Sequence, residues 1–171
     1  MIPVYAHGFF TVCKDGTVLQ HIVFNYVDPS KKYEQIINDP ERLEEELRTI
    51  SKNMQNFLDS EEVLINGVRT YPKVRSVWVG LSGSADRPYI ELLITFKGEL
   101  KPGINIYEDK YEPDIAEYDY SVTWVFPEDS RIIEVDVGFD YVMNGNVLRF
   151  SVPEGSETPG YEKISFYLES L

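Results

Sequence analysis

The sequence predicts an α+β protein in which one long helix, over about residues 40–59, packs on a large, twisted antiparallel sheet. Three observations predict this class: one amphipathic helical segment, several tight-turn dipeptides between apolar runs, and alternation of apolar and polar residues in the second half of the chain. A sheet of eight or more strands tends to curl or split. The alternative is therefore a small α+β domain followed by a β-sandwich-like domain.

The strands are expected between turn signals, of which the clearest are Asp15-Gly16, Asn66-Gly67 and Asn144-Gly145. The segments typical of strands are residues 4–13, 18–27, 62–65, 68–71, 74–81, 89–97, 117–126, 132–137, 139–143, 146–152 and 162–168. We expect everything after Glu61 to be antiparallel β structure.

The long helix is predicted by its start signal and its apolar stripe. Asp39 can accept hydrogen bonds from the first free backbone amides, and Pro40 suits the first helical position. The apolar side chains that recur at helical spacing are Leu43, Leu47, Ile50, Met54, Phe57 and Leu58. We expect this stripe to cover the protein's own sheet. A shorter helix is expected between Asp28-Pro29 and Ile37.

The first hairpin limits what the two histidines and the single cysteine can do. A two-residue turn at Asp15-Gly16 would place His21 opposite Phe10 and His7 on the other face. Along one strand, Cys13 lies ~20 Å from His7, which is too far for a Cys–His nucleophile pair. We interpret both histidines and the cysteine as structural.

Alternation in the second half predicts a sheet with one dry face and one wet, acidic face. The side chains expected on the dry face are Tyr118, Tyr120, Val122, Trp124, Phe126, Ile133, Val135 and Val137. An Asn144-Gly145 turn would place Asp140 opposite Arg149, as a cross-strand ion pair.

The whole chain, residues 1–171, is expected to form a single domain, with a subdivision near 101–103 as the best candidate boundary. A single cysteine allows no internal disulfide, and the N-terminus lacks the basic start and apolar core of a secretory signal. No apolar run approaches the ~20 residues that span a bilayer. We expect a cytoplasmic protein with no membrane partner.

Residues 99–171 carry nearly all of the net charge of −13. They hold 16 Asp and Glu against 5 Lys and Arg, whereas residues 1–98 hold 13 against 11. A surface of one sign repels nucleic acid and anionic membrane and attracts cationic partners. The candidate interaction residues are Glu108, Asp109, Glu112, Asp114, Glu117, Asp119, Glu134 and Asp136.

Hard cations such as Ca²⁺ bind several carboxylates, so this acidic cluster is also the candidate metal site. The Asp-x-Asx-x-Asx-Gly spacing of a calcium loop is missing, however, and Lys110 lies inside the cluster. We expect a solvated acidic face, with no metal and no other cofactor.

One stretch, residues 66–101, has the opposite sign. The candidate basic patch comprises Arg69, Lys73, Arg75 and Arg87. Interleaved aromatic side chains could help such a patch to grip a single nucleic-acid strand. No zinc-finger, RNP-type or helix-turn-helix pattern is present, so we expect no nucleic-acid partner. The patch complements the acidic half and could join copies in a homo-oligomer.

The sequence favours binding over catalysis. We expect a non-catalytic acidic interaction or assembly protein, whose partner is a cationic protein or a second copy of itself. One alternative is a carrier with an aromatic-lined pocket for a small apolar ligand. The other is a carboxylate- or metal-dependent enzyme, marked by an Asp or Glu on the dry side of a strand with a raised pKa. Asp140 is the residue to examine for that mark.

Overall fold

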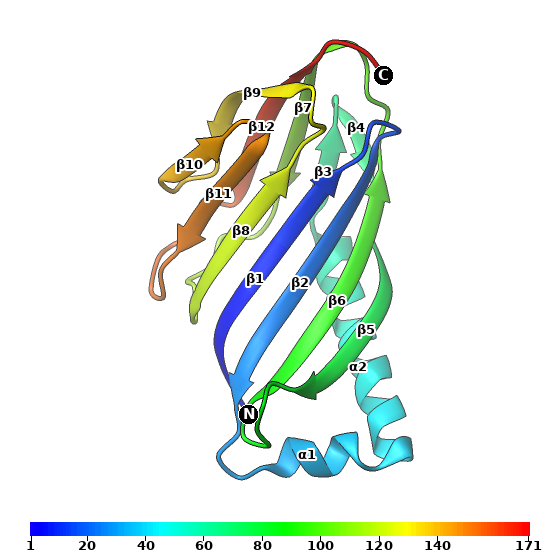
Figure 1. The fold of residues 1–171 in the computed structure, drawn as a ribbon, viewed down its shortest axis with the longest axis vertical. Helices are drawn as coiled ribbons and strands as arrows, with labels where there is room; N and C mark the ends of the chain where they lie inside the picture. Colours follow the sequence, from blue (N-terminus) through cyan, green and yellow to red (C-terminus); the bar gives the residue numbers. More distant parts are fainter.

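A computed structural model describes residues 1–171 and has two helices and twelve strands (Figure 1). The helices are α1 (Lys32–Ile37) and α2 (Pro40–Ser60). The strands of the first half are β1 (Ile2–Val12), β2 (Thr17–Val27), β3 (Glu62–Ile65), β4 (Val68–Thr70), β5 (Lys73–Leu81) and β6 (Pro88–Lys97). The strands of the second half are β7 (Gly103–Lys110), β8 (Asp119–Val125), β9 (Ser130–Asp136), β10 (Tyr141–Asn144), β11 (Val147–Val152) and β12 (Tyr161–Leu168).

The strands form two sheets, and in Figure 1 the smaller sheet lies behind the upper part of the larger one. The seven-stranded sheet has the order β10-β11-β8-β1-β2-β6-β5, and the five-stranded sheet the order β4-β3-β7-β12-β9. Every pair is antiparallel except β1 and β8, which are parallel. The predicted class, a long helix on mainly antiparallel sheet, is confirmed. Both sheets combine strands from before and after residue 103.

The core is an aromatic cluster to which both sheets contribute. Trp124 on β8 stacks on Phe10 of β1, with 4.2 Å between ring centroids, and lies 4.5 Å from the ring of Tyr107 on β7. Phe126 follows β8 and lies 4.7 Å from Phe166 of β12. Such pairs add specific ring contacts to the burial of apolar surface. The dry face predicted around Trp124 is therefore the surface on which the two sheets pack against each other.

Helix α2 begins and ends close to the predicted bounds. The Asp39 carboxylate accepts hydrogen bonds from the backbone amides of Glu41 and Arg42, at 3.2 and 3.3 Å. Gln55 fixes the helix to the edge of the seven-stranded sheet, because its side chain accepts from the amide of Val74 and donates to the carbonyl of Pro72. Neither helix combines the length and the apolar character that crossing a membrane would require.

The predicted register of the first hairpin is wrong, because its turn has three residues, Lys14-Asp15-Gly16, rather than two. Phe9 rather than Phe10 lies opposite His21, so the two histidines share a face. Gly16 has a φ of 87°, which suits the last position of a three-residue hairpin loop. His7 contacts the Thr123 hydroxyl at 3.0 Å, and His21 contacts the Glu91 carboxylate at 2.9 Å.

Two further expectations about the acidic half are wrong. The turn between β10 and β11 is Gly145-Asn146, so Val142 rather than Asp140 lies opposite Arg149. The side chain of Ile133 is 54% exposed, and Ile132 packs against the core in its place. A register shift between β9 and β12 interrupts the strict alternation at this point.

Candidate functional site

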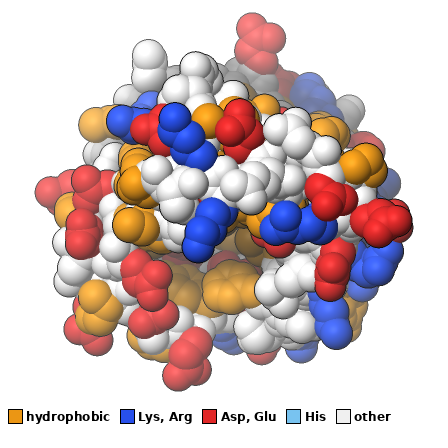
Figure 2. All heavy atoms as spheres, turned by 90° about the horizontal axis from the view of Figure 1, so that it is seen from below, with side chains coloured by type: hydrophobic (Ala, Val, Ile, Leu, Met, Phe, Trp, Pro, Cys, Tyr) orange, Lys and Arg blue, Asp and Glu red, His pale blue; other side chains and the backbone are white.

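A cavity of about 760 Å³ opens beside the aromatic core, between the inner face of the seven-stranded sheet and the strands β7 and β12. Sixteen of the 28 residues that line it are hydrophobic. Figure 2, which views the molecule from the end where α1 lies, shows a hollow with hydrophobic side chains inside it, acidic side chains to its left, and basic side chains along its upper edge. The inner face predicted from the sequence is therefore solid core at one end and a pocket at the other.

The floor of the cavity is built by strand alternation. Every second residue of neighbouring strands points to the same face of a sheet. The floor residues from β1, β2 and β8 are Ala6, Gly8, Phe10, Gln20, Ile22, Phe24, Tyr120 and Val122. Gly8 leaves the centre of this floor open, since a Cβ built there has only one neighbour within 4 Å, an atom of Phe10 at 3.9 Å.

The last turns of α2 form one wall of the cavity. Met54, Phe57 and Leu58, the final members of the predicted apolar stripe, line it. Leu58 is buried, whereas the side chain of Phe57 is 59% exposed. The stripe thus covers its own sheet, as expected, and also closes the side of a pocket.

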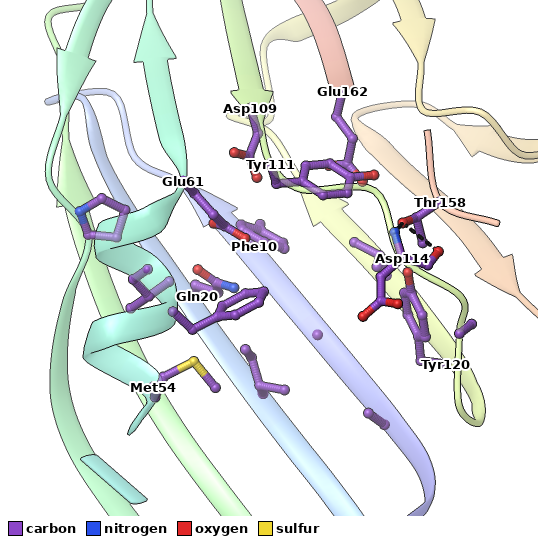
Figure 3. A pocket seen from close by; sticks show the side chains of 18 of the residues that line it. Phe10, Gln20, Met54, Glu61, Asp109, Tyr111, Asp114, Tyr120, Thr158 and Glu162 are labelled. Atoms are coloured by element: carbon purple, nitrogen blue, oxygen red, sulfur yellow. Dashed lines mark hydrogen bonds between the residues drawn. The ribbon is translucent and has the colours of Figure 1, made fainter. Parts of the chain in front are cut away.

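The opposite wall is the segment 111–118, which leads from β7 to β8. Thr158 holds this segment in place: its hydroxyl accepts from the amide of Asp114 at 2.9 Å and donates to the carbonyl of Asp114 at 3.0 Å (Figure 3). The amide of Ala116 donates to the carbonyl of Ser156. Three acidic residues of this segment, Glu112, Asp114 and Glu117, line the cavity.

Three carboxyl groups from different elements lie at the inner end of the cavity (Figure 3). Glu61 is the residue at which α2 ends. Asp109 on β7 and Glu162 on β12 are directly opposite each other in an antiparallel pair, and so point to the same face. Like charges in this arrangement repel each other. Glu61, Asp109 and Glu162 are called the inner carboxyls below.

Asp109 is the most enclosed of the inner carboxyls. The residue is 8% exposed, and its Oδ1 atom has no hydrogen-bond partner. Glu61 and Glu162 are half-buried and face the cavity. None of the three forms a salt bridge, and the cavity lining contains no Lys, Arg or His. The inner carboxyls are therefore a cluster of acidic groups with no basic side chain among them.

Burial and mutual repulsion favour the neutral form of the inner carboxyls. Burial raises the pKa of Asp109 to about 7. Burial, and then the charge of Asp109, raise the pKa of Glu162 to about 8. The pKa of Glu61 is raised to about 8 by burial and by both of the other carboxyls. Near neutral pH, the cluster therefore holds protons that a nearby cation would displace.

Three tyrosines, Tyr107, Tyr111 and Tyr120, line the cavity together with the inner carboxyls. Burial, followed by the charge of Glu162, raises the pKa of Tyr120 to about 12 and also raises that of Tyr111. The pKa of Tyr107 is raised by burial and then by the carboxyls of Asp109, Glu162 and Glu61. These hydroxyls stay protonated around neutral pH, so the polar end of the cavity offers donors as well as carboxyl oxygens.

The candidate acidic surface of the sequence is divided by the structure. The expectation that Asp109 lies on a solvated face is wrong, because Asp109 is buried and lines the cavity. Glu112, Asp114 and Glu117 also line the cavity. On the other face, Glu108 accepts from the Tyr161 hydroxyl at 2.7 Å, Asp136 is exposed, and Glu134 pairs with Lys163 at 3.1 Å. Asp119 accepts from the amide of Glu154. No group of His, Cys, Asp and Glu side chains has the arrangement of a metal site.

The candidate basic residues do not form one patch. Arg69 is on β4 of the five-stranded sheet and stacks over Tyr71, 5.5 Å from the ring centroid. Lys73 and Arg75 are on β5 of the other sheet, where Arg75 donates to the Thr95 hydroxyl. Arg87 follows the far end of β5, roughly 27 Å from Lys73 along the strand.

Sequence reasoning missed β7 and, with it, two of the inner carboxyls. From the sequence, no strand is expected over 103–110, and Glu108 and Asp109 are assigned to the acidic surface, although Asp109 is two residues from the buried Tyr107 and four from the buried Asn105. Glu162 likewise precedes Ile164, Phe166 and Leu168, all buried, at alternating positions. The available signal was an acidic residue that continues the alternation of large, mostly apolar residues along one face of a strand. The position of Glu61 had no such signal, because it depends on where α2 ends.

Comparison with known proteins identifies no family: no family model and no curated protein sequence matches the chain. Among solved structures, it is similar to the folded domain of LppM from Mycobacterium tuberculosis, with 10% identity, a TM-score of 0.44 and coverage of 96% of this chain and 91% of that one. An aminopeptidase N family protein from Idiomarina loihiensis has 7% identity and a TM-score of 0.40. That match covers 94% of this chain but only 29% of the other.

Proposed function

We propose that the protein binds a small, largely apolar molecule in the cavity between its sheets. The observation that carries this proposal is the cavity itself, about 760 Å³ with a mainly hydrophobic lining. Ligand pockets typically measure ~300–1,000 Å³ and combine apolar walls with a few polar groups that orient the ligand. Here the polar groups gather at the inner end, so the ligand has a defined orientation.

Two other functions have less support from the structure than ligand binding has. The inner carboxyls, with their raised pKa values, favour a carboxylate-dependent enzyme as a second candidate, because a general acid needs such a group. An enzyme of that kind would use the same cavity, so ligand binding is the first test of either. The acidic interaction or assembly function and the cytoplasmic location stay predictions, and the burial of Asp109 removes one member of the proposed surface.

Fluorescence of Trp124 provides the test of ligand binding. Trp124 stacks on Phe10, which lines the cavity, and the only other tryptophan, Trp78, is exposed and can be replaced by Phe. We expect 1-decanol, added to the Trp78→Phe protein below the concentration at which it aggregates, to change Trp124 emission saturably.

Gly8→Leu is the blocking variant, because it builds a side chain into the open floor of the cavity. Phe9→Leu is its matched control, on the neighbouring residue, which is 39% exposed and points to the other face of β1. We expect Gly8→Leu to abolish the decanol response and Phe9→Leu to keep it. A response that survives Gly8→Leu, or is absent from the parent protein, would contradict the proposed function.

A further inference from the structure

We propose that the ligand of the cavity is an amphiphilic amine, whose protonated head is held by the inner carboxyls Glu61, Asp109 and Glu162 and whose apolar body lies along the floor. This inference rests on the proposed function and names the class of ligand. It is carried by Asp109, a nine-tenths buried residue with an unpartnered carboxyl oxygen at the end of a mainly apolar cavity.

A buried polar atom with no hydrogen bond is destabilising, and for a carboxylate the cost is larger than for a neutral group. Oδ1 of Asp109 is such an atom, and it belongs to a residue that lines the cavity. A donor on the ligand would satisfy this oxygen after a side-chain movement that exposes it to the cavity.

Six acidic residues line the cavity, namely Glu61, Asp109, Glu112, Asp114, Glu117 and Glu162, and no basic residue does. The field in the cavity is therefore negative, and low-dielectric walls strengthen the attraction of a cation over that in water. A carboxylate or phosphate head group would meet repulsion at the same position.

An ammonium group has three donors and no acceptor, and three carboxyls line the inner end of the cavity: Glu61 just after α2, Asp109 on β7 and Glu162 on β12 (Figure 3). A bare metal ion is disfavoured, because the carboxyls do not meet in the arrangement of a metal site. The apolar floor, with Phe10, Ile22 and Phe24, suits the body of an amphiphile.

The experiment compares three probes of one chain length, n-decylamine, 1-decanol and decanoate, by Trp124 fluorescence in the Trp78→Phe protein at pH 8. Charge-assisted hydrogen bonds are stronger than neutral ones, so we expect decylamine to bind about tenfold or more tightly than decanol, and decanoate to bind most weakly. Equal binding of amine and alcohol, or tighter binding of decanoate, would overturn this inference and leave the proposed function intact. If no probe binds, both fail.

Two double variants test whether the inner carboxyls cause the preference for decylamine over decanol. Asp109→Asn/Glu162→Gln removes two inner carboxyls, whereas Glu108→Gln/Asp136→Asn removes two carboxyls that flank Lys163 on the other face of the same sheet. Both variants change the net charge equally. We expect only the first to lose the preference for the amine while still binding decanol, which also shows that it is folded. Loss of the preference in neither variant, or equally in both, would overturn the inference.

The pH dependence gives an independent readout on the unmodified cavity. Asp109 lies opposite Glu162 of β12, and Glu61 at the end of α2 and Tyr107 on the strand of Asp109 line the same end of the cavity. Tyr111, Glu112, Asp114 and Glu117 lie on the segment 111–118, Tyr120 lies on β8, and Arg69 of β4 donates to the backbone carbonyl of Glu61 at 3.2 Å. Decylamine stays protonated up to about pH 10. Its affinity should therefore rise from pH 6 to pH 9 as the inner carboxyls ionise, while that of decanol should not. A flat or falling amine profile would contradict the assignment.

Discussion

Among single residues, the inner carboxyls have the largest energetic consequence. Asp109 and Glu162 are opposite each other on neighbouring strands, where like charges repel, and no cation balances them. Stability would be higher with apolar residues at both positions. The folded protein therefore keeps an unfavourable arrangement, as is common at binding sites, where groups are set for a ligand rather than for stability.

This arrangement predicts how stability depends on pH. The pKa of Asp109 is about 7 and those of Glu61 and Glu162 about 8 in the folded state, against about 4 in an unfolded chain. Between about pH 4 and 8, the folded state thus holds more protons than the unfolded state. The free energy of unfolding should therefore fall as pH rises from 5 to 8, and level off above that.

Urea unfolding followed by circular dichroism at several pH values measures this slope. Asp109→Asn/Glu162→Gln should flatten it, while Glu108→Gln/Asp136→Asn, with the same change in net charge, should leave it nearly unchanged. Asp28 and Asp129, whose pKa values are lowered mainly by hydrogen bonds to Ser30 and to Lys14, act in the opposite direction but only in the acid range. Identical slopes in the two double variants would contradict the assignment of the slope to the cavity.

Among the elements, α2 has two roles, since it covers the edge of a sheet and ends in a cavity residue. Its start is set by Asp39 and Pro40, and its last turn positions Phe57, Leu58 and Glu61. Gln55 ties the same turn to β5 through the amide of Val74 and the carbonyl of Pro72. The N-terminal end of α2 thus contributes to stability, whereas its C-terminal end forms part of the cavity.

Removal of the N-cap should therefore weaken the fold without changing the site. Asp39→Ala is expected to lower the free energy of unfolding by ~1 kcal/mol, because two backbone amides lose their acceptor. Asp39→Asn keeps an acceptor and should cost much less. Decanol binding, measured under conditions where both variants are folded, should be unchanged. A loss of decanol affinity in Asp39→Ala alone would contradict this separation.

For the whole molecule, one end is close-packed and the other is hollow. Phe166 is 2% exposed and packs within the aromatic core, whereas Phe24 lines the cavity. Phe166→Ala should lower the free energy of unfolding by ~3–5 kcal/mol, since it leaves a void among close-packed side chains. Phe24→Ala should cost clearly less, because its side chain already borders empty space. Chemical unfolding measures both, and equal losses would contradict this division.

At the same scale, the sequence predicted the class of the fold because its local signals agree with the tertiary structure. The Asp39-Pro40 start, the apolar stripe of α2 and the alternation around Trp124 each depend on nearby residues only. The parallel pairing of β1 with β8, the division into two sheets and the registers of two hairpins depend on distant contacts or on one residue of turn length. The cavity was foreseen only as an alternative, because aromatic residues on a strand face suit a solid core and a pocket equally.

The pairing of β1 with β8 has a consequence for how the protein acquires its shape. Tyr5 and Ser121 are hydrogen-bonded across this pair although 116 positions separate them along the chain. Contacts of such long range slow folding, because a large loop must close before they form. On the ribosome, β1, β2, α2, β5 and β6 emerge before any residue of β8 or β12. The cavity and its acidic end are then completed only when β12 has been made, so a nascent chain acquires the proposed ligand site after both helices and the other eleven strands.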